Sequence, residues 1–499
     1  MAIHLGPILA FRGATNSTWK TSALVVTDRA DRPTVSFSTP TAVLSQATQM
    51  LESPGGLVAW RIDWEVPRTT TESSVEYEIS DSGKHVYSVP AAGGPLRFAF
   101  GSCNGFSDPK LMKSIEVKNE RWNHLHDQHS KQAYHLLLLG GDQVYGDEIW
   151  QQKHSNVFSK WLSKGRRLRR KSDFGVTMRT FADRFYFELY VSRWRQAEVA
   201  RVLASIPTLM SWDDHDTFDG WGSYPEEDQS CPVYRELGKI ARRHYRVFQL
   251  QERDPGEVGP GRLSAGNSLS WGYRIDDIAI LGLDLRSERT RESVIMSDAA
   301  WSATVDWLAS VAKGAKHLLV VSSIPVVYPS LRMLEGVLGF IPGQQELEDD
   351  MRDHWTSPPH EPERVRLVHN LLDFSHAESC RVTLLSGDVH VGALGEIVSM
   401  RRPERPRGAR VISQLISSAI VHPPPPKVAR LYLELTGGKE DRIDADITAR
   451  MVPFTGAGAD LFIPERNWLA LEFDDQLQLW AKLWTEGRPD PLWKVIHPV

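Results

Sequence analysis

Six apolar runs of strand length recur between residues 96 and 387, and each ends in small or polar residues. They read LRFAFGS, AYHLLLLGG, IPTLMSW, IAILGLD, HLLVVSS and RVTLLSG. Longer amphipathic stretches, such as MSDAAWSATVDWLASVAK at residues 296–313, alternate with them. This alternation predicts a layered α/β domain. Because ligands bind outside the carboxyl ends of strands in open α/β sheets, we expect segments hundreds of residues apart to build one site there.

Residues 1–94 follow a different pattern. The runs SALVVTD, PTVSFST, LVAWRIDWEV and SVEYEIS alternate apolar and polar positions between Gly, Pro, Asp and Ser clusters, which predicts an antiparallel β-sandwich without helices. The turn-forming residues of VPAAGGPL (89–96) are the expected boundary. We therefore expect an N-terminal domain over 1–94 and a larger domain over 95–499. In the larger domain, a helical insertion or cap is expected at about 147–206 and a closing β-hairpin at WLALEFDDQLQLWAKLW (468–484).

Charge and hydropathy exclude some classes of protein. The net charge of -5 argues against a surface built throughout to hold nucleic acid, so no stable nucleic-acid complex is expected. No window approaches the roughly 20 apolar residues of a membrane-spanning helix, and no secretory signal is visible, so the default expectation is a cytoplasmic protein. One basic run, KWLSKGRRLRRKSDF (160–174), is interpreted as a solvated helix face, with contact to an anionic substrate or partner as the alternative.

Metal-ligand side chains follow four of the predicted strands. Three cysteines are too few for a disulfide framework, so the cysteine of FAFGSCNGF needs another role. Carboxylates, one thiolate and one phenolate suit an oxidised iron in one position and a harder divalent ion in another. An apolar core would not tolerate this mixture unpaired. The donors at these strand ends are Cys103, Asp142, Tyr145, Asp214, His215, Asp388 and His390.

The ordered motifs GSCN, GDQVY, WDDHD and SGDVH, preceded by the predicted β-sandwich, resemble the metal-binding motifs of a known family. That family is the PhoD-like alkaline phosphatases and phosphodiesterases, within the calcineurin-like metallophosphoesterase superfamily. The resemblance implies a four-layer α/β/β/α sandwich behind an N-terminal β-domain. It also implies hydrolysis of phosphate mono- or diesters to phosphate by a metal-activated water at a dinuclear site, with no covalent enzyme intermediate.

The same resemblance implies a set of metal ligands. One metal is iron(III) by family analogy, and the second is calcium or another divalent ion such as magnesium, manganese or zinc. The ligands that the resemblance implies are Cys103, Asp142, Tyr145 and His390 for the first metal, and Asp142, Asp214 and Asp388 for the second.

Three further side chains are expected to act on the substrate. His215 falls where relatives keep a histidine that faces the phosphate, and we expect it to protonate the leaving oxygen. Asn104 is expected to donate to a phosphate oxygen. Arg286 in LGLDLRSERT is expected to bind phosphate oxygens through its forked guanidinium, with a structural ion pair to Asp284 as an equal alternative. Asp213 and Asp216 are expected to support the ligand loops.

Two other classes of function stay open. One is a mononuclear iron redox protein, since Cys, Tyr and His are all iron ligands. The other is a non-catalytic protein that binds phosphorylated partners on the same fold, although the intact set of donors argues against it. The histidines of NHLHDQHSKQAYH (123–135) fit no recognised zinc spacing and predict a solvated helix.

Overall fold

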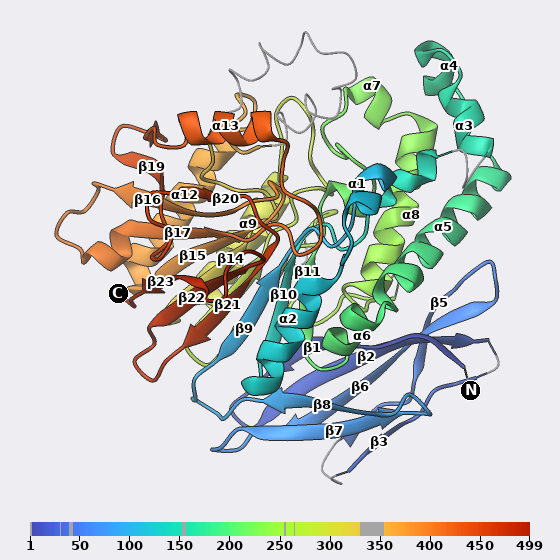
Figure 1. The fold of residues 1–499 in the computed structure, drawn as a ribbon, viewed down its shortest axis with the longest axis horizontal. Helices are drawn as coiled ribbons and strands as arrows, with labels where there is room; N and C mark the ends of the chain where they lie inside the picture. Colours follow the sequence, from blue (N-terminus) through green and yellow to red (C-terminus); the bar gives the residue numbers. More distant parts are fainter. Residues whose placement is uncertain are drawn as a thin grey trace.

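The computed structural model describes residues 2–499 except 30, 39–42, 152–155, 254–255, 264 and 330–353. The described part is a mixed α/β structure with two large sheets of eleven and nine strands and one small sheet of three. Helices lie on the outer sides of the large sheets (Figure 1). Among the described helices, none has the length and hydrophobicity that crossing a bilayer requires.

The first large sheet contains β1 (Ile3–Ala14), β2 (Thr18–Asp28), β4 (Val43–Leu44), β5 (Thr48–Glu52), β6 (Leu57–Pro67), β9 (Arg97–Gly101), β10 (Leu136–Gly140), β11 (Thr208–Ser211), β21 (Asn467–Phe473), β22 (Leu479–Thr485) and β23 (Leu492–Ile496). Its order is β23-β22-β21-β9-β10-β11-β1-β2-β6-β4, with β5 also paired to β6. The central strands β9, β10, β11 and β1 are parallel. The predicted closing hairpin is confirmed as the antiparallel pair β21–β22.

The second large sheet contains β12 (Trp271–Ile275), β13 (Ile278–Gly282), β14 (His317–Val321), β15 (Arg381–Ser386), β16 (Gly392–Ser399), β17 (Val411–Ile416), β18 (Asp441–Arg442), β19 (Ile447–Val452) and β20 (Phe462–Ile463). Its order is β12-β13-β14-β15-β17-β16-β19-β18, and β20 pairs with β16. All six strands predicted from apolar runs are confirmed, with β9, β10 and β11 in one sheet and β13, β14 and β15 in the other.

The described helices are α1 (Pro109–Ser114), α2 (Glu120–Lys131), α3 (Asn156–Leu162), α4 (Arg166–Arg170), α5 (Val176–Trp194), α6 (Ala197–Leu203), α7 (Glu226–Gln229), α8 (Pro232–Phe248), α9 (Asp298–Ser310), α12 (Glu361–Glu378) and α13 (Lys427–Thr436), with short 3-10 turns η1 (Gly146–Trp150), η2 (Asp214–Asp216) and η3 (Arg407–Arg410). The described residues of 147–206 are largely helical, residues 152–155 lie outside them, and the role of this segment as an insertion or cap stays a prediction. Within it, α5 and α6 pack on the first large sheet, whereas α3 and α4 extend outward (Figure 1).

Side chains of the central strands alternate between two apolar cores. In β10, Leu136 and Leu138 join the core between the two large sheets, while Leu137 and Leu139 join the core beneath α2, α5 and α6. In β14, Leu319 enters the core between the sheets and its neighbours enter the core beneath α9 and α12. This two-residue alternation explains why these strands are apolar at every position, because both faces of a helix-covered sheet are buried.

The strands of residues 1–94 are continuous with the first large sheet. Ala10 of β1 pairs with Thr208 of β11, and β2 and β6 extend the sheet from there. The remaining strands, β3 (Val35–Phe37), β7 (Ser73–Ile79) and β8 (Lys84–Val89), form the small sheet, whose Tyr87 hydroxyl accepts a 2.9 Å hydrogen bond from Trp64 of β6. No helix occurs among the described residues of 1–94. The separate N-terminal sandwich and its boundary at residue 94 stay predictions.

The histidine-rich helix α2 is not the solvated helix that its sequence predicts. His124 accepts a 3.0 Å hydrogen bond from Trp468 of β21, and His129 accepts one from the backbone of Tyr134. His135 is completely buried and accepts from the Arg97 backbone. The helix itself is confirmed over Glu120–Lys131, but full solvation is wrong, because His124 and His129 are half-buried and hydrogen-bonded and His135 is buried beyond the end of the helix.

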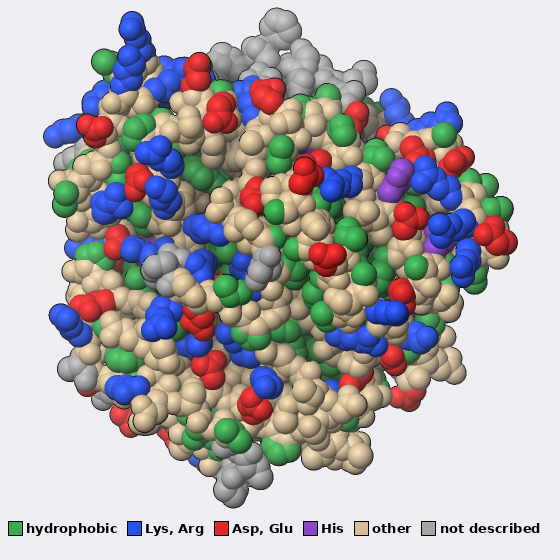
Figure 2. All heavy atoms as spheres, turned by 180° about the vertical axis from the view of Figure 1, so that it is seen from behind, with side chains coloured by type: hydrophobic (Ala, Val, Ile, Leu, Met, Phe, Trp, Pro, Cys, Tyr) green, Lys and Arg blue, Asp and Glu red, His purple; other side chains and the backbone are tan. Residues whose placement is uncertain are grey.

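Surface charge is mixed. On the face turned away in Figure 1, Lys and Arg side chains are interspersed with Asp and Glu side chains (Figure 2). In the basic run, Arg166 and Arg170 of α4 both contact Asp228 of α7. Part of the positive charge of this run is therefore neutralised within the chain.

The two large sheets meet at their strand ends through close backbone contact. A Cβ atom on Gly387, directly after β15, would lie 2.4 Å from Ser102 Oγ and 3.2 Å from the carbonyl oxygen of Gly140. A Cβ atom on Gly141, which has a φ of +109°, would lie 2.9 Å from Asp213 Cβ. Only glycine fits at these two positions, and they bring four predicted strand ends together.

Gly387→Ala is expected to destabilise the protein by about 1–3 kcal/mol, because the added methyl group overlaps Ser102 across the junction of the sheets. The measurement is the midpoint of thermal unfolding under matched conditions. Gly438→Ala is the control, since its Cβ would meet no atom within 4 Å. Equal midpoints for the two variants would contradict the close junction.

Candidate metal centre

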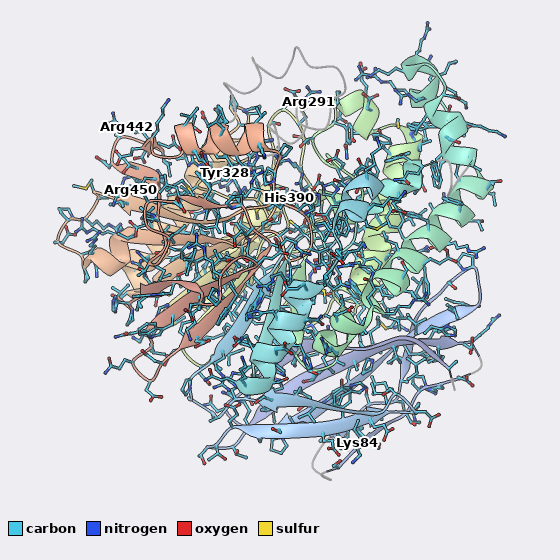
Figure 3. All side chains as sticks on the ribbon, viewed as in Figure 1. Lys84, Arg291, Tyr328, His390, Arg442 and Arg450 are labelled. Carbon is cyan, nitrogen blue, oxygen red and sulfur yellow. The ribbon has the colours of Figure 1, made fainter. Side chains whose placement is uncertain are left out.

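Four of the predicted ligands have left-handed backbone conformations at strand ends. The φ angles are +53° for Cys103, +55° for Asp142, +70° for Asp388 and +53° for His390. Such values are uncommon for residues other than glycine and concentrate at functional sites, where the surrounding structure imposes them. Two of these residues follow strands of the first large sheet and two follow β15 of the second. In Figure 3, His390 lies above the ends of the central strands, far from Lys84 of the small sheet.

The Asp216 carboxylate holds the ligand loops together. Its oxygens accept hydrogen bonds from the backbone N–H groups of Asp142 at 3.1 Å, Gln143 at 3.2 Å and Val144 at 3.3 Å. They also accept from the Asp213 backbone at 2.9 Å and from the Gln249 side chain of the loop after α8 at 2.8 Å. This supports the expected loop-stabilising role, because one buried carboxylate fixes the turns after both β10 and β11.

The thiol and phenol of the site are buried beside a carboxylate. Cys103 Sγ lies 3.6 Å from Asp142 Oδ2 and 3.1 Å from Ser418 Oγ. Burial and the nearby Asp142 raise the pKa of Cys103 well above its ordinary value. Burial, Cys103 and Asp142 also raise the pKa of Tyr145 well above its ordinary value. Without a cation, the thiol and the phenol therefore stay protonated.

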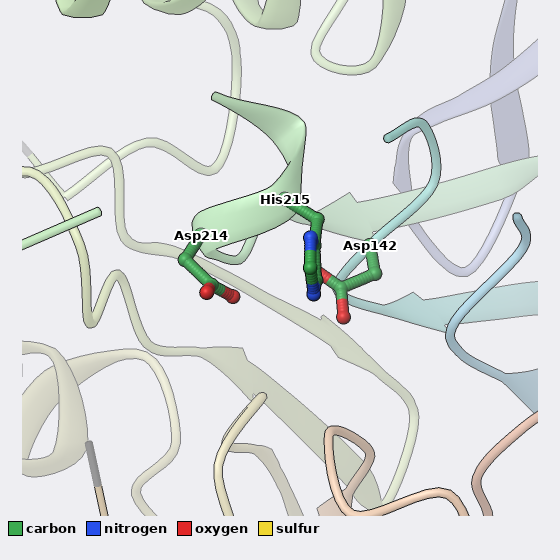
Figure 4. Close-up of side chains that lie close together, drawn as sticks. All are labelled: Asp142, Asp214 and His215. Carbon is green, nitrogen blue, oxygen red and sulfur yellow. The ribbon is translucent and has the colours of Figure 1, made fainter. Parts of the chain in front are cut away.

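Carboxylates and imidazole converge in two overlapping groups. Ligand atoms of Asp142, Asp214 and His215 lie within 4.8 Å of one another (Figure 4). A second group with the same spacing joins Asp213, Asp214 and Asp388. Asp214 belongs to both groups, so the described residues contain two candidate metal-binding clusters that share a carboxylate.

Unpaired buried atoms indicate that the site fits cations. Asp142 Oδ1, Tyr145 OH and His390 Nε2 are buried without a hydrogen-bond partner in the described structure. Burial also raises the pKa of Asp142, although His215 opposes the shift. Leaving such groups unpaired costs about 1–3 kcal/mol each, and a metal ion would satisfy acceptors of all three kinds. The donor set and its orphaned atoms thus fit a metal centre. The two clusters include His215 and Asp213, which were not predicted as ligands, and contain neither Cys103 nor His390, so the predicted ligand sets stay predictions.

His215 is oriented by a carboxylate that the sequence analysis missed. Asp147 Oδ2 lies 2.8 Å from His215 Nδ1, and Asp147 Oδ1 accepts from the backbone of Asp219. Burial opposes the imidazolium, but Asp147 and Asp214 outweigh it and raise the pKa of His215 well above its ordinary value. The contact leaves Nε2 to face the site. Asp147 lies two residues after Tyr145, and only that proximity could have indicated its role.

The side chain of Asn104 is oriented by hydrogen bonds to its amide oxygen. Asn104 Oδ1 accepts hydrogen bonds from Trp122 Nε1 at 2.9 Å and from Arg193 Nη2 at 2.5 Å. Arg193 Nε also donates to the Asn104 carbonyl at 2.7 Å. This orients the amide so that its NH₂ group points toward Gln143, whose carbonyl oxygen lies 3.4 Å away. Contact of Asn104 with a phosphate stays a prediction.

Arg286 is buried within the carboxylates that follow β11. Its Nε contacts Asp213, and its Nη2 lies 3.3 Å from Asp214 Oδ1. Asp284 instead accepts from the Arg286 backbone at 3.1 Å and from Trp212 Nε1 at 2.8 Å. The alternative of a structural ion pair with Asp284 is therefore wrong. Arg286 does form ion pairs, but with Asp213 and Asp214. Binding of phosphate by Arg286 stays a prediction.

Asp216→Asn is expected to destabilise the protein by about 1–3 kcal/mol and to lower its metal content. Asparagine replaces one acceptor oxygen with a donor, so two or more of the backbone N–H groups now bound by Asp216 lose their partner. Thermal unfolding and elemental analysis are the measurements. Asp306→Asn on the exposed face of α9 is the matched control. Unchanged stability of the Asp216 variant would contradict the role of this carboxylate.

Comparisons with known proteins agree with this architecture. A solved structure of PhoD matches with a TM-score of 0.58, covering 98% of this chain and 88% of that chain at 14% sequence identity, which concerns the fold alone. The uncharacterized protein YGR266W of Saccharomyces cerevisiae is 27% identical over 498 aligned residues, which cover 82% of this chain and 70% of the yeast protein.

The family model described as PhoD related phosphatase matches residues 96–341 and 333–436, which is more than half of the chain. The matched segment includes every predicted ligand and the strands that carry them. The mixed α/β architecture with large sheets is that of the PhoD fold. The resemblance expected from the strand-end motifs is confirmed, and the chain belongs to the PhoD-related phosphatase family.

Proposed function

We propose that this protein hydrolyses phosphate mono- or diesters at a dinuclear metal centre. The observation that carries the proposal is the convergence of buried carboxylates and an imidazole at one junction of strand ends, with the Cys103 thiol 3.6 Å from Asp142. Asp142 Oδ1, Tyr145 OH and His390 Nε2 are buried and unpaired there. The proposed architecture is a four-layer catalytic sandwich behind an N-terminal β-domain. It is supported by the separate apolar cores on the two faces of each large sheet.

The proposed ligands divide between the two sheets. Cys103, Asp142, Tyr145 and His390 would hold a first metal, with iron(III) the proposed occupant. Asp142, Asp214 and Asp388 would hold a second, with calcium or another divalent ion as the occupant. When bound, such ions acidify water to serve as nucleophile and neutralise charge on the phosphoryl oxygens.

Protein side chains supply orientation and a proton. The Asp147 contact at 2.8 Å holds one proton on His215 Nδ1 and, with Asp214, favours the imidazolium, whose second proton on Nε2 would go to the leaving oxygen. Arg193 and Trp122 hold the Asn104 amide oxygen. One N–H of its NH₂ group faces the Gln143 carbonyl oxygen, and the other would donate to a phosphate oxygen. Arg286 keeps Asp213 and Asp214 in place, and its positive charge lies beside the site where the phosphate would bind.

Metal content and chelation test the proposal directly. The unaltered protein is expected to contain two metal ions per chain by elemental analysis, and to hydrolyse mono- or bis-nitrophenyl phosphate until a chelator removes them. Tyr145→Phe should lose metal, since it removes an oxygen ligand. Tyr134→Phe is the matched control, because Tyr134 is also buried but precedes β10 rather than following it.

The result also separates the other classes of function. One iron per chain with electron or oxygen chemistry would support the mononuclear redox protein instead. Bound metal without turnover of either ester would favour a protein that only binds phosphorylated ligands. Activity that survives complete removal of metal would refute the metal centre itself.

Removal of the proton donor should depend on the leaving group. His215→Ala is expected to lower kcat for phenyl phosphate about 10²- to 10⁴-fold, and much less for nitrophenyl phosphate, because nitrophenolate leaves without protonation. Asp147→Asn should show the same pattern with a smaller loss. Steady-state kinetics on both esters measure it.

Asp183→Asn is the control for Asp147→Asn. Asp183 also contacts a buried histidine, with Oδ1 3.4 Å from His244 Nε2, but this pair lies between α5 and α8. Asp183→Asn should leave kcat unchanged for both phenyl phosphate and nitrophenyl phosphate. Equal losses for the two esters in His215→Ala would rule out the acid role.

A further inference from the structure

A column of four aromatic rings runs through the proposed metal centre. The ring of His215 stacks on Tyr145 with centroids 4.4 Å apart and an interplanar angle of 30°. Tyr145 is nearly parallel to His422 at 5.9 Å and 16°, and His422 stacks on His390 at 3.7 Å and 23°. Two proposed ligands of the first metal, Tyr145 and His390, are thus both in contact with one ring that is outside every predicted motif.

Both ring nitrogens of His422 already have hydrogen-bond partners. Nδ1 lies 2.8 Å from the carbonyl oxygen of Pro423, which can only accept, so Nδ1 carries the proton. Nε2 lies 3.3 Å from Ser107 Oγ and accepts from that hydroxyl. The backbone N–H of His422 donates to the Cys103 carbonyl at 3.2 Å. These contacts occupy both ring nitrogens and leave no lone pair for a metal.

The two ligand rings lack the usual means of orientation. Metal-binding histidines commonly donate their second ring N–H to a carboxylate or carbonyl group, which sets the ring plane. Among the described residues, neither ring nitrogen of His390 has a hydrogen-bond partner, and its only hydrogen bond joins its backbone N–H to Ser418 Oγ at 2.9 Å. The Tyr145 hydroxyl is likewise unpaired. Ring contacts are what remains to hold both side chains.

We propose that His422 is a positioning residue that orients His390 and Tyr145 toward the first metal by stacking instead of by hydrogen bonds. Its flat face fixes the plane of His390, and the same ring, nearly parallel to Tyr145, limits the tilt of that side chain. The inference rests on the proposed metal centre. It predicts that the ring of residue 422, rather than its nitrogens, is required.

Variants that separate the ring from its nitrogens test this proposal. His422→Phe keeps a flat ring and is expected to retain iron(III) affinity, whereas His422→Leu removes the ring and should weaken it about 10- to 100-fold, the loss typical when support of a metal ligand is removed. Affinity is measured by competition with a chelator. The visible charge-transfer band of the iron-loaded protein reports the phenolate bond of Tyr145 and should weaken or shift only in the ring-free variant.

His129→Leu is the matched control, since His129 stacks on Tyr134 at 6.3 Å and 24° on α2 and should change neither readout. If His422→Leu failed to fold, His422→Gln provides a second ring-free side chain. Equal affinity and spectra in the ring-free variants and the unaltered protein would overturn the positioning role. Equal losses in His422→Phe and the ring-free variants would overturn it too, because the nitrogens would then matter. Absence of bound metal in the unaltered protein would instead refute the proposed function.

Discussion

A single buried carboxylate, that of Asp216, ties together the turns that build the site. It binds three consecutive backbone N–H groups after β10 and one after β11, so the left-handed turn at Asp142 and the turn that presents Asp214 share one anchor. Burial raises the pKa of Asp216 to about 7, even though these hydrogen bonds lower it. The same constraint places Asp142 Oδ2 3.6 Å from Cys103 Sγ and an Asp142 oxygen within 4.8 Å of ligand atoms of Asp214 and His215.

The electrostatics of the centre make it dependent on cations. The Cys103 thiol, the Tyr145 phenol and the Asp142 carboxyl group are all buried, with the thiol 3.6 Å from the carboxylate, and burial raises the pKa of each. Their ionised forms are costly in this setting unless a positive charge lies among them. Arg286 supplies such a charge on the Asp213–Asp214 side. Burial opposes ionisation of Asp214, but Arg286 together with His215 and backbone hydrogen bonds lowers the pKa of this carboxyl group. On the Cys103 side, no Lys or Arg forms a salt bridge with the Asp142 carboxylate among the described residues. Metal binding and deprotonation of the ligands should therefore be coupled there.

Much of the architecture follows from local sequence. The remaining parts depend on contacts between segments that are distant in the sequence. The six central strands were predictable because both of their faces are buried, which makes them apolar throughout. The pairing of β1 with β11 was not, because it joins residues about 200 positions apart and local alternation does not specify a partner. At the site, the motifs identified the donors. They could not identify His422, whose role arises only where a proline-rich loop crosses the Cys103 turn, nor the Asp213 partner of Arg286.

The division of the donors between two sheets has a mechanical consequence. Asp142 and Asp214 follow strands of one sheet, while Asp388 and His390 follow β15 of the other. Their separation depends on how closely the sheets approach, which Gly141 and Gly387 permit by having no side chain. The ring column crosses the same junction, since Tyr145 and His390 belong to opposite sheets and His422 lies between them. Packing between the sheets therefore sets the distances between the metal ligands. A substitution that shifts one sheet against the other should alter metal binding even when no ligand residue is changed.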